Sequence, residues 1–594
     1  MSHAITLLVR RDFWCFVKNT VTNQCPSFAR CDDFLMIFSV FVTQSESPLL
    51  IVAIFVTGIG GTFQYGFQIS VMTSPSSFIK DLVNATCEQR YGLSLEPQEI
   101  NLIWSFLVSV FCIGGLLGSL CAGRLTAEYG RKRCLLFNNF VAISAAVLML
   151  LSKTAMSFEM ILVGRFLYGI NAGVSLSVHT MYLVECAPKR LRGMVGVSVA
   201  TFVSLGKFCG QLLGLSELLG TETGWPWLLA FCGATATLQL LTLPLLPESP
   251  RYLLLERGDR QGCEQAVRRL WGSSRDHGEE VEEMLQEHAA QQGVRTHTVL
   301  EFLLERTLRW QLATVLVTFS ALQLCGINAV YLYSFDVFRE AGIPAHQLRH
   351  VALGTGLCEI SVSLACCPGR MGKQIWSWTY WLRTTHWLLW DHSASVWYVG
   401  VVCSGAQTGN PVCFLYLLQV MVIESTGKKL LLFRGLLCMA ATLGLLTITL
   451  YLQTQVSWMP YCSMALIFLF ILFFSSGPAG VTAPLPGEIF TQSFKPAAFT
   501  VGCTLNWTGL FLLGMLFPLI VEYLDYFCFL IFLGVCLLSG LFVWYNVPET
   551  KNRTVLEITA DFYRMHSKTG LSEEAKPKQP EATGTVSSCK TTKL

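Results

Sequence analysis

Apolar residues are arranged along this chain in long blocks separated by shorter polar segments. A helix that spans a bilayer needs about 20 mostly apolar residues, and twelve blocks come close to or exceed this length. The blocks run over 49–72, 101–123, 134–152, 159–184, 194–215, 225–246, 311–334, 348–367, 430–452, 461–487, 497–521 and 527–547. A polar stretch from Arg251 to Arg309 separates the first six blocks from the last six. The pattern predicts an all-α membrane protein with two six-helix halves joined by short amphipathic helices.

The composition supports a membrane protein and argues against several other classes. Only 14% of the 594 residues are charged, whereas a soluble domain carries about a quarter, and the mean hydropathy is +0.50. The net charge of +3 is spread through loops and gives no basis for nucleic-acid binding. Most of the 23 cysteines lie in apolar blocks, where free cysteine behaves as a small hydrophobe. No spacing indicates a metal, a cofactor or an enzyme's nucleophile and base, so we expect none of these.

Basic residues in the short loops indicate the orientation of the chain, because such residues accumulate on the cytoplasmic side. Arg131 and Lys132 follow the second block, and Lys189 follows the fourth. Lys428 precedes the ninth block, and Lys495 follows the tenth. All of these loops fall on one side, together with the polar stretch and both termini. We expect a multi-pass plasma-membrane protein with both termini in the cytoplasm.

The loop over 73–100 then lies outside the cell and contains the sequon Asn84-Ala85-Thr86. Asn84 is therefore a candidate glycosylation site. The sequons at Asn506 and Asn552 are discounted, because the first is expected within the membrane and the second in the cytoplasm.

Three landmarks recur at a nearly constant offset between the two halves. They are Gly130-Arg131-Lys132 with Gly427-Lys428-Lys429, Glu185 with Glu488, and Pro247–Pro250 with Pro548–Lys551. This recurrence indicates duplication of a six-helix unit, an architecture that places a substrate site between the halves near the middle of the bilayer. We divide the chain into a cytoplasmic leader, an N-terminal half, an intracellular helical linker, a C-terminal half and a cytoplasmic tail: 1–48, 49–250, 251–310, 311–550 and 551–594.

With these motifs the chain resembles the facilitative hexose transporters, in the sugar porter branch of the major facilitator superfamily. The resemblance covers about 49–562, apart from one insert, and rests on GRLTAEYGRKR at 123–133, Gly164-Arg165, ECAPKRLRG at 185–193, PESPRYLL at 247–254, QLCGINAVYLY at 323–333, GPAG at 477–480 and PETK at 548–551. FQYGF at 63–67 and GQLLGL at 210–215 favour the fructose and urate subgroup. The resemblance implies twelve helices in two halves and passive uniport of a hexose by alternating access.

Charged residues at the cytoplasmic ends form the first candidate group, for which the family implies gating. The group is Arg131, Lys132, Glu185, Arg192, Lys428, Glu488 and Lys495, with Arg165 added from inside the fourth block. Ion pairs between such residues are expected to hold the cytoplasmic side shut in one state and to break in the other. For any single lysine in a loop, the alternative is that it has no gating role and reflects only the usual excess of basic residues on the cytoplasmic side. Lys207 in the fifth block does not match the family, and it either snorkels or lines the cavity and favours an anion.

Polar side chains within the apolar blocks form the second candidate group. A neutral sugar needs amides and indoles rather than fixed charge. The family places sugar contacts at the positions of Gln323, Asn328 and Trp507. Tyr65 and Glu359 complete the candidate substrate-binding set. The alternative for each amide is a hydrogen bond between helices.

Several positions depart from the family pattern. Ala200, Leu322 and Glu359 stand where many relatives carry amides, and Ala483 follows the Gly-Pro motif of the tenth block. Fewer amides and one extra carboxylate weaken a glucose assignment and keep urate as an alternative substrate. Proton–sugar symporters of this fold carry an aspartate where this chain has Gln68, so passive transport is favoured, although Glu359 remains a possible site for proton coupling.

Residues 368–421 match no element of the family and interrupt the eighth block. They hold six of the 15 tryptophans. A full extra span here would place Lys428 outside the cell, against the positive-inside rule. We interpret the segment as a product of alternative splicing or of a retained intron. A transport-inactive isoform or a solute sensor is therefore a further hypothesis. The partners we expect are a small-molecule substrate, hexose or urate, and the lipid bilayer; the oligomeric state is left open.

Overall fold

The computed structural model describes the two halves and most of the polar linker. The described residues are 48–188, 191–272, 278–291, 297–365 and 427–566, apart from single positions at 454, 457, 492, 552 and 554. Residues 1–47 of the expected leader and the whole expected insert, 368–421, lie outside the described residues.

Helices account for all the regular secondary structure in these described ranges, and their bounds follow the apolar blocks closely. The N-terminal half contains α3 (Pro48–Gly60), α4 (Thr62–Ser70), α6 (Pro97–Tyr129), α7 (Arg131–Ser152), α8 (Phe158–Cys186), α9 (Arg192–Leu213) and α10 (Trp225–Thr242). The C-terminal half contains α15 (Arg309–Leu324), α16 (Ile327–Leu332), α18 (Leu348–Ala365), α22 (Lys428–Leu452), α23 (Met459–Ser476), α24 (Pro478–Thr482), α25 (Leu485–Ile489), α26 (Lys495–Leu524) and α27 (Cys528–Asn546). The prediction of an all-α protein is confirmed.

Nine helical stretches within the described part are long and apolar enough to cross a bilayer. The longest, Lys495–Asn546, contains both α26 and α27, which are joined by a short turn. Helix α9, whose apolar part is the shorter Ser198–Leu213, and helix α18 supply the two remaining spans. These elements together correspond to the twelve predicted blocks.

Three of the predicted spans are broken, which the apolar pattern did not indicate. The first span breaks at Gly61, between α3 and α4. The seventh breaks at Gly326, whose φ of +95° favours a residue without a side chain. The tenth breaks at Gly477, before Pro478 begins α24. Broken helices of this kind are tolerated in membranes where they lie inside the protein, and here all three carry candidate site residues.

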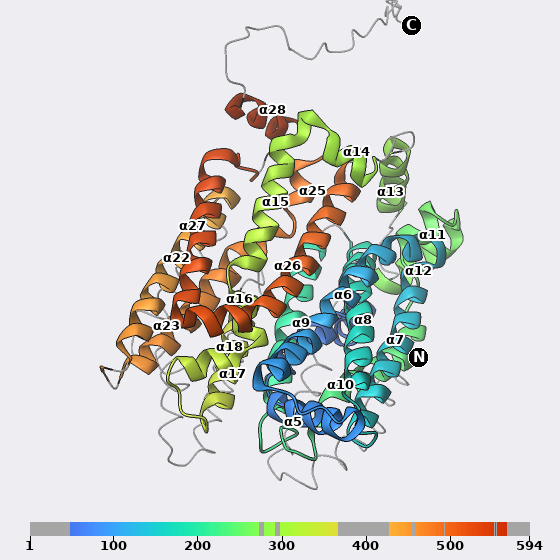
Figure 1. The fold of residues 1–594 in the computed structure, drawn as a ribbon. Helices are drawn as coiled ribbons and strands as arrows, with labels where there is room; N and C mark the ends of the chain where they lie inside the picture. Colours follow the sequence, from blue (N-terminus) through green and yellow to red (C-terminus); the bar gives the residue numbers. More distant parts are fainter. Residues whose placement is uncertain are drawn as a thin grey trace, which may run out of the picture.

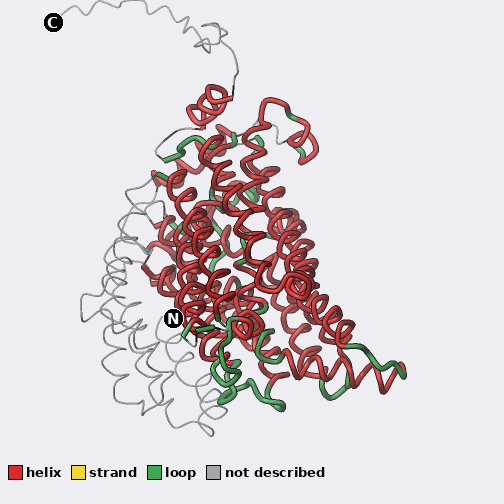
Figure 2. The backbone as a smooth tube through the Cα atoms, turned by 60° about the vertical axis from the view of Figure 1, so that its left-hand side comes forward, coloured by secondary structure: helices red, strands yellow, loops and turns green. Residues whose placement is uncertain are grey.

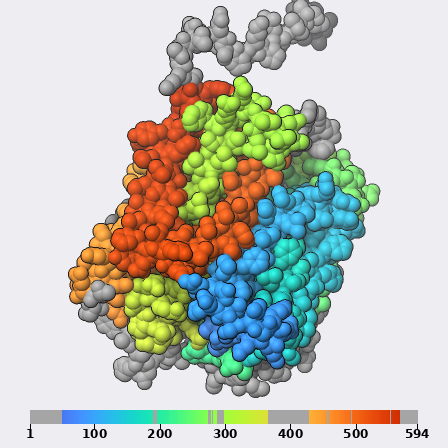
Figure 3. All heavy atoms as spheres, in the orientation of Figure 1, coloured from blue at the N-terminus to red at the C-terminus, as the bar shows by residue number. Residues whose placement is uncertain are grey.

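The two halves stand side by side, and two pairs of helices form most of their contact, with a smaller contact between α4 and α16 (Figures 1 and 3). Helix α6 packs against α26, and helix α9 packs against α18. In Figure 3 the N-terminal half, blue to cyan, and the C-terminal half, yellow-green to red, adjoin along one boundary.

The outside of the bundle is apolar, as expected for a surface that faces lipid. Leu117, Phe137, Val147, Leu241 and Leu538 each expose nearly half or more of their surface. A second view shows the helices running lengthwise, with loops gathered at the two ends of the bundle (Figure 2). Because such an extended apolar surface is rare on a soluble monomer, it supports the membrane assignment.

The two ends of the bundle carry different short helices. One end holds the linker helices α11 (Pro250–Leu255), α12 (Arg260–Trp271), α13 (Gly278–Gln291) and α14 (Val299–Leu304), together with α28 (Val555–His566) from the tail (Figure 1). The opposite end holds α5 (Ser76–Thr86) and α17 (Ser334–Glu340). The charge pattern of the loops predicts that the first end faces the cytoplasm.

Candidate functional site

Three amide side chains form a continuous hydrogen-bonded cluster in the C-terminal half. The Asn328 amide donates to Gln323 Oε1, and the Gln323 amide donates to Asn506 Oδ1, each at 2.5 Å. The break at Gly326 separates α15 from α16 and lets the start of α16 face the end of α15. The structure thus brings Gln323 and Asn328 together, as the resemblance implies, and adds Asn506.

Trp507 lies beside this cluster and reaches across to the N-terminal half. Its side chain is 1% exposed, and its indole N–H donates to Ser119 Oγ on α6 at 2.9 Å. The ring of Tyr65, on α4, meets the Trp507 ring edge-on with the centroids 5.7 Å apart. Phe111 contacts both rings. Trp507 and Tyr65 thus meet where α26 of one half contacts α4 and α6 of the other, and the amides of Gln323 and Asn328 join them through Asn506, the neighbour of Trp507.

Glu359, the fifth predicted residue, binds a different partner. It forms an ion pair with Lys207 on α9, whose Nζ lies 2.9 and 3.0 Å from the two carboxylate oxygens. Lys207 is 6% exposed and Glu359 is 8% exposed. The snorkelling interpretation of Lys207 is wrong, because its ammonium is held inside the protein by a carboxylate of the other half.

Arg165 lies in the interior of the N-terminal half, away from the cytoplasmic charges with which it was grouped. It is fully buried and donates to the backbone oxygen and to the side-chain oxygen of Gln68, at 2.9 and 3.0 Å. It also donates to the carbonyl of Val108 and lies 4.7 Å from the Phe111 ring centroid. Arg165 therefore joins α4, α6 and α8, and its gating role stays a prediction.

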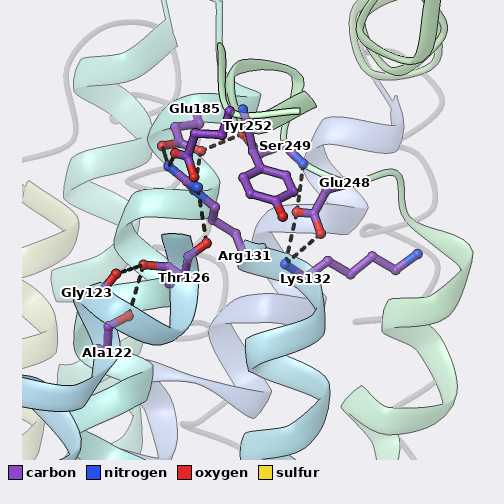
Figure 4. A network of polar contacts seen from close by, with 10 residues as sticks. Ala122, Gly123, Thr126, Arg131, Lys132, Glu185, Glu248, Ser249 and Tyr252 are labelled. Carbon is purple, nitrogen blue, oxygen red and sulfur yellow. Dashed lines mark hydrogen bonds and ion pairs between the residues drawn. The ribbon is translucent and has the colours of Figure 1, made fainter. Parts of the chain in front are cut away.

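The cytoplasmic charges of the N-terminal half form a compact network (Figure 4). Arg131 pairs with Glu185 at 3.0 Å and with Glu256, just after α11, at 2.7 Å. Ser249 donates to the second carboxylate oxygen of Glu185 at 2.5 Å. The Arg131 guanidinium also lies over the Tyr252 ring, 5.0 Å from its centroid. The expected Arg131–Glu185 contact is present, and the start of the linker is tied to it.

The carboxylate of Glu248, which precedes α11, caps the N-terminus of α7. It accepts hydrogen bonds from the backbone N–H groups of Lys132 and Ser249 (Figure 4). The first N–H groups of a helix have no partner within the helix, and the helix dipole favours a negative charge there. Burial raises the pKa of Glu248, and these N–H groups oppose the rise. The Lys132 ammonium donates to the carbonyls of Pro244 and Leu246 rather than to Glu185.

The C-terminal half repeats this arrangement. Lys428 pairs with Glu488, and Glu549 accepts hydrogen bonds from the backbone N–H groups of Lys428 and Lys429 at the start of α22. Arg192 begins α9, but its side chain lies outside the described residues, and Lys495 begins α26 half-buried. Each ion pair described in these two networks lies within one half or its linker, and the gating role of these residues stays a prediction.

A cavity of about 350 Å³ lies between the halves at the end of the bundle opposite the linker. Its walls come from α5 and α6 of one half and from α17, α22 and α26 of the other. Asn84 lies at the same end, on α5, and is half-buried. The sequon's Thr86 is fully buried and donates to the carbonyl of Leu82. Glycosylation of Asn84 stays a prediction.

Comparison with known proteins decides the family. The model of the family described as "Sugar (and other) transporter" matches residues 53–366 and 408–562. The chain belongs to this sugar transporter family. The match resumes at residue 408 rather than at 422, so the segment without a family counterpart is 367–407, shorter than the expected insert.

Curated relatives and solved structures agree with this assignment. The chain is 40% identical to human solute carrier family 2, facilitated glucose transporter member 11, over 88% of this chain and 94% of that one. It is 40% identical to human member 9, over 86% and 85%, and 36% identical to member 5 of Bos taurus, over 89% and 95%. The inward-open xylose transporter XylE from E. coli superimposes with a TM-score of 0.63 at 19% identity, over 86% of this chain and 99% of that one. The predicted major facilitator fold is thereby confirmed.

Several residues of this sugar transporter site were missed in the sequence. Asn506 was considered only as a discounted sequon, and Ser119 carries no pattern that marks it as the partner of an indole. The role of Glu248 and Glu549 could have been found, because each belongs to a motif that repeats between the halves. Lys207 and Glu359 were each noticed, but nothing in the sequence paired them.

Proposed function

We propose that this sugar transporter carries a hexose, glucose or fructose, passively across the plasma membrane, with both termini in the cytoplasm. The observation that carries the proposal is the amide cluster of Gln323, Asn328 and Asn506 next to Trp507, whose indole bonds the other half. The relatives named as facilitated glucose transporters support the same class of substrate.

The chemistry of the cluster suits a neutral polyol. Amides offer both donors and acceptors to hydroxyl groups, and the Trp507 and Tyr65 rings offer faces against which a sugar ring packs. In this structure the amides hydrogen-bond one another. A sugar hydroxyl that replaces one amide partner therefore leaves no buried polar group unpaired, which keeps the exchange inexpensive.

The surroundings of Arg165 support passive transport rather than proton coupling. Its guanidinium is bonded to the side-chain oxygen of Gln68, an amide that does not titrate. Proton-coupled transport needs a group that gains and loses a proton during the cycle, and this contact contains none. Glu359, the remaining candidate for coupling, is neutralised by Lys207.

Alternating access is supported by the way the two cytoplasmic networks are built. Each network joins elements of its own half or of the linker, so each half has a fixed cytoplasmic end. Two such rigid ends are able to move relative to one another without losing the carboxylates that cap α7 and α22. We propose that Arg131, Glu185, Lys428 and Glu488 support gating by keeping each half rigid.

Uptake of radiolabelled fructose, glucose and urate into oocytes tests the proposal. We expect saturable hexose uptake that is unaffected by a proton gradient and that falls about 5- to 150-fold in Gln323→Leu, because an unsatisfied hydroxyl in the site costs on the order of 1–3 kcal/mol. The experiment includes a form that lacks 367–407, the segment without a family counterpart.

The outcomes separate the hypotheses. Uptake only by the shortened form would identify the full chain as an inactive isoform. Uptake of urate without hexose would replace the substrate. No uptake of any of the three by either form would overturn the proposal.

A further inference from the structure

The contact between α9 and α18 is built from polar side chains that face one another across the two halves. Three residues on one face of α9 meet three on one face of α18, with the spacing of successive helical turns. We call this the α9–α18 seam, and it consists of Ser204, Lys207 and Gln211 opposite Ser363, Glu359 and Thr355.

The ion pair is the central contact of this seam. Ser204 Oγ donates to Glu359 Oε1 at 3.2 Å on one side of it and lies 2.9 Å from Ser363 Oγ. On the other side, Gln211 donates to Thr355 Oγ1 at 2.9 Å. Lys207 and Glu359 expose only 8% and 11% of their side chains. Both charges are therefore held in a largely dry environment, where each is costly without the other.

The pair lies beside the candidate sugar site. The Lys207 ammonium is 4.0 Å from the centroid of the Tyr331 ring. Tyr331 belongs to α16, three residues after Asn328, and residues at this spacing share one face of a helix. On the other side, the Gly66 backbone of α4, next to Tyr65, packs against the α9 backbone at Val203. The ion pair thus contacts α16, the helix that carries Asn328, and α9 packs against α4, the helix that carries Tyr65.

Stability alone does not account for these two charges. Apolar side chains of similar size often hold a buried contact as well as an ion pair does. An ion pair differs from apolar side chains because it fixes the net charge at its position. In a low-dielectric interior, the net charge close to a binding site favours solutes of opposite charge and disfavours those of like charge. With Lys207 present, the Glu359 carboxylate presents no net charge to the path.

We propose that Lys207 is a specificity-determining residue of the transport path: by neutralising Glu359 it makes the path select sugars without net charge and reject charged ones. This inference rests on the proposed function, because it concerns the solute that passes between the halves. It assigns to Lys207 and Glu359 opposite effects on selectivity, which a purely structural role would not produce.

Three sugars with the same ring and different charge test the inference. D-glucose is neutral, D-glucosamine is a cation slightly below neutral pH, and D-glucuronate is an anion. Their uptake is compared in the wild type, in Lys207→Met, in Glu359→Gln and in the variant with both changes, each normalised to the amount of protein at the surface. Ligand-induced thermal shifts of the purified chains provide a second readout that needs no delivery to the membrane.

The expected changes have opposite signs. Lys207→Met leaves a bare carboxylate and raises the glucosamine-to-glucose ratio, whereas Glu359→Gln leaves a bare ammonium and raises the glucuronate-to-glucose ratio. We expect about tenfold in each case, the size for one unit charge roughly 10 Å from the solute at an effective dielectric of about 20. The double variant returns both ratios to the wild-type values.

The results distinguish this inference from the proposed function. If neither the wild type nor the form without 367–407 takes up or binds glucose or fructose, the proposed function is overturned and the inference with it. A wild type that takes up glucose, with ratios unchanged in both single variants, overturns the inference alone. Should one single variant not be recovered folded, the other tests the same claim with the sugar of opposite charge.

Discussion

The two contacts between the halves use different chemistry for the same task. The α9–α18 seam is polar and contains a buried ion pair. The contact of α6 with α26 is built from small residues and one large ring, since Gly115 leaves room for Trp507 and the indole bonds Ser119. Close packing of small residues is a common way to join helices in membranes, whereas polar side chains fix register and partner. The small residues of the α6–α26 contact therefore set how closely the halves approach. The ion pair of the α9–α18 seam sets the net charge buried between them.

Removal of one charge from the α9–α18 seam is expected to cause the largest loss of stability among the changes that test this comparison. Lys207→Met leaves Glu359 buried without its partner, which costs about 3–5 kcal/mol of stability. Removal of both charges in Lys207→Met/Glu359→Gln leaves no uncompensated charge, and we expect its stability to lie close to that of the wild type. Thermal unfolding of the purified chains in detergent measures the difference.

The double-mutant cycle provides the control for this experiment. If the loss in the double variant equals the sum of the losses in the two single variants, Lys207 and Glu359 are not coupled. That result would mean that neutral hydrogen bonds hold the seam. The ion pair would then no longer distinguish the α9–α18 seam from the α6–α26 contact.

The small-residue contact is tested at Gly115. A Cβ at this position would lie 2.3 Å from the Trp507 ring, too close to be accepted without movement of the indole. We expect Gly115→Ala to cost about 1–3 kcal/mol through overpacking, and to lower hexose uptake because Trp507 shifts away from Tyr65. Thermal unfolding and uptake measure the two effects.

Gly123, on the same helix, is the matched control. A Cβ there meets no other atom within 4 Å, and alanine is a better helix former than glycine by about 1 kcal/mol. Gly123→Ala is therefore expected to keep or slightly raise stability. Equal losses in the two variants would show that the backbone of α6, rather than the space beside Trp507, responds to the change.

Much of the fold was predictable because the apolar blocks are dictated by the bilayer. Each predicted span corresponds to helices in the structure, and the repeated motifs identified the two halves. The breaks at Gly326 and Gly477 were not predicted, because a run of apolar residues looks the same whether or not one glycine interrupts the helix. The break at Gly326 is what brings Asn328 to Gln323.

The candidate site was predictable in part. Residues with a family counterpart, such as Gln323 and Trp507, lie where the two halves meet. Lys207 has no family counterpart, and its partner lies 152 positions away in the chain. Pairing across such a distance depends on how the halves dock, which a local pattern does not encode.

The hydrogen bond between Gln211 and Thr355, at one end of the α9–α18 seam, has the smallest expected effect on stability. Its loss shows whether the contacts of the seam contribute separately. Thr355→Val keeps the shape of the side chain and removes the oxygen that accepts from Gln211. Hydrogen bonds between helices in membranes contribute about 0.6 kcal/mol on average, so we expect a loss of that order in thermal unfolding. Thr447→Val is the matched control, because the Thr447 hydroxyl on α22 donates within its own helix, to Leu443. A loss at Thr355 as large as that at Lys207 would mean that the seam acts as one cooperative unit, so that its charge balance could not be changed without changing how the halves dock.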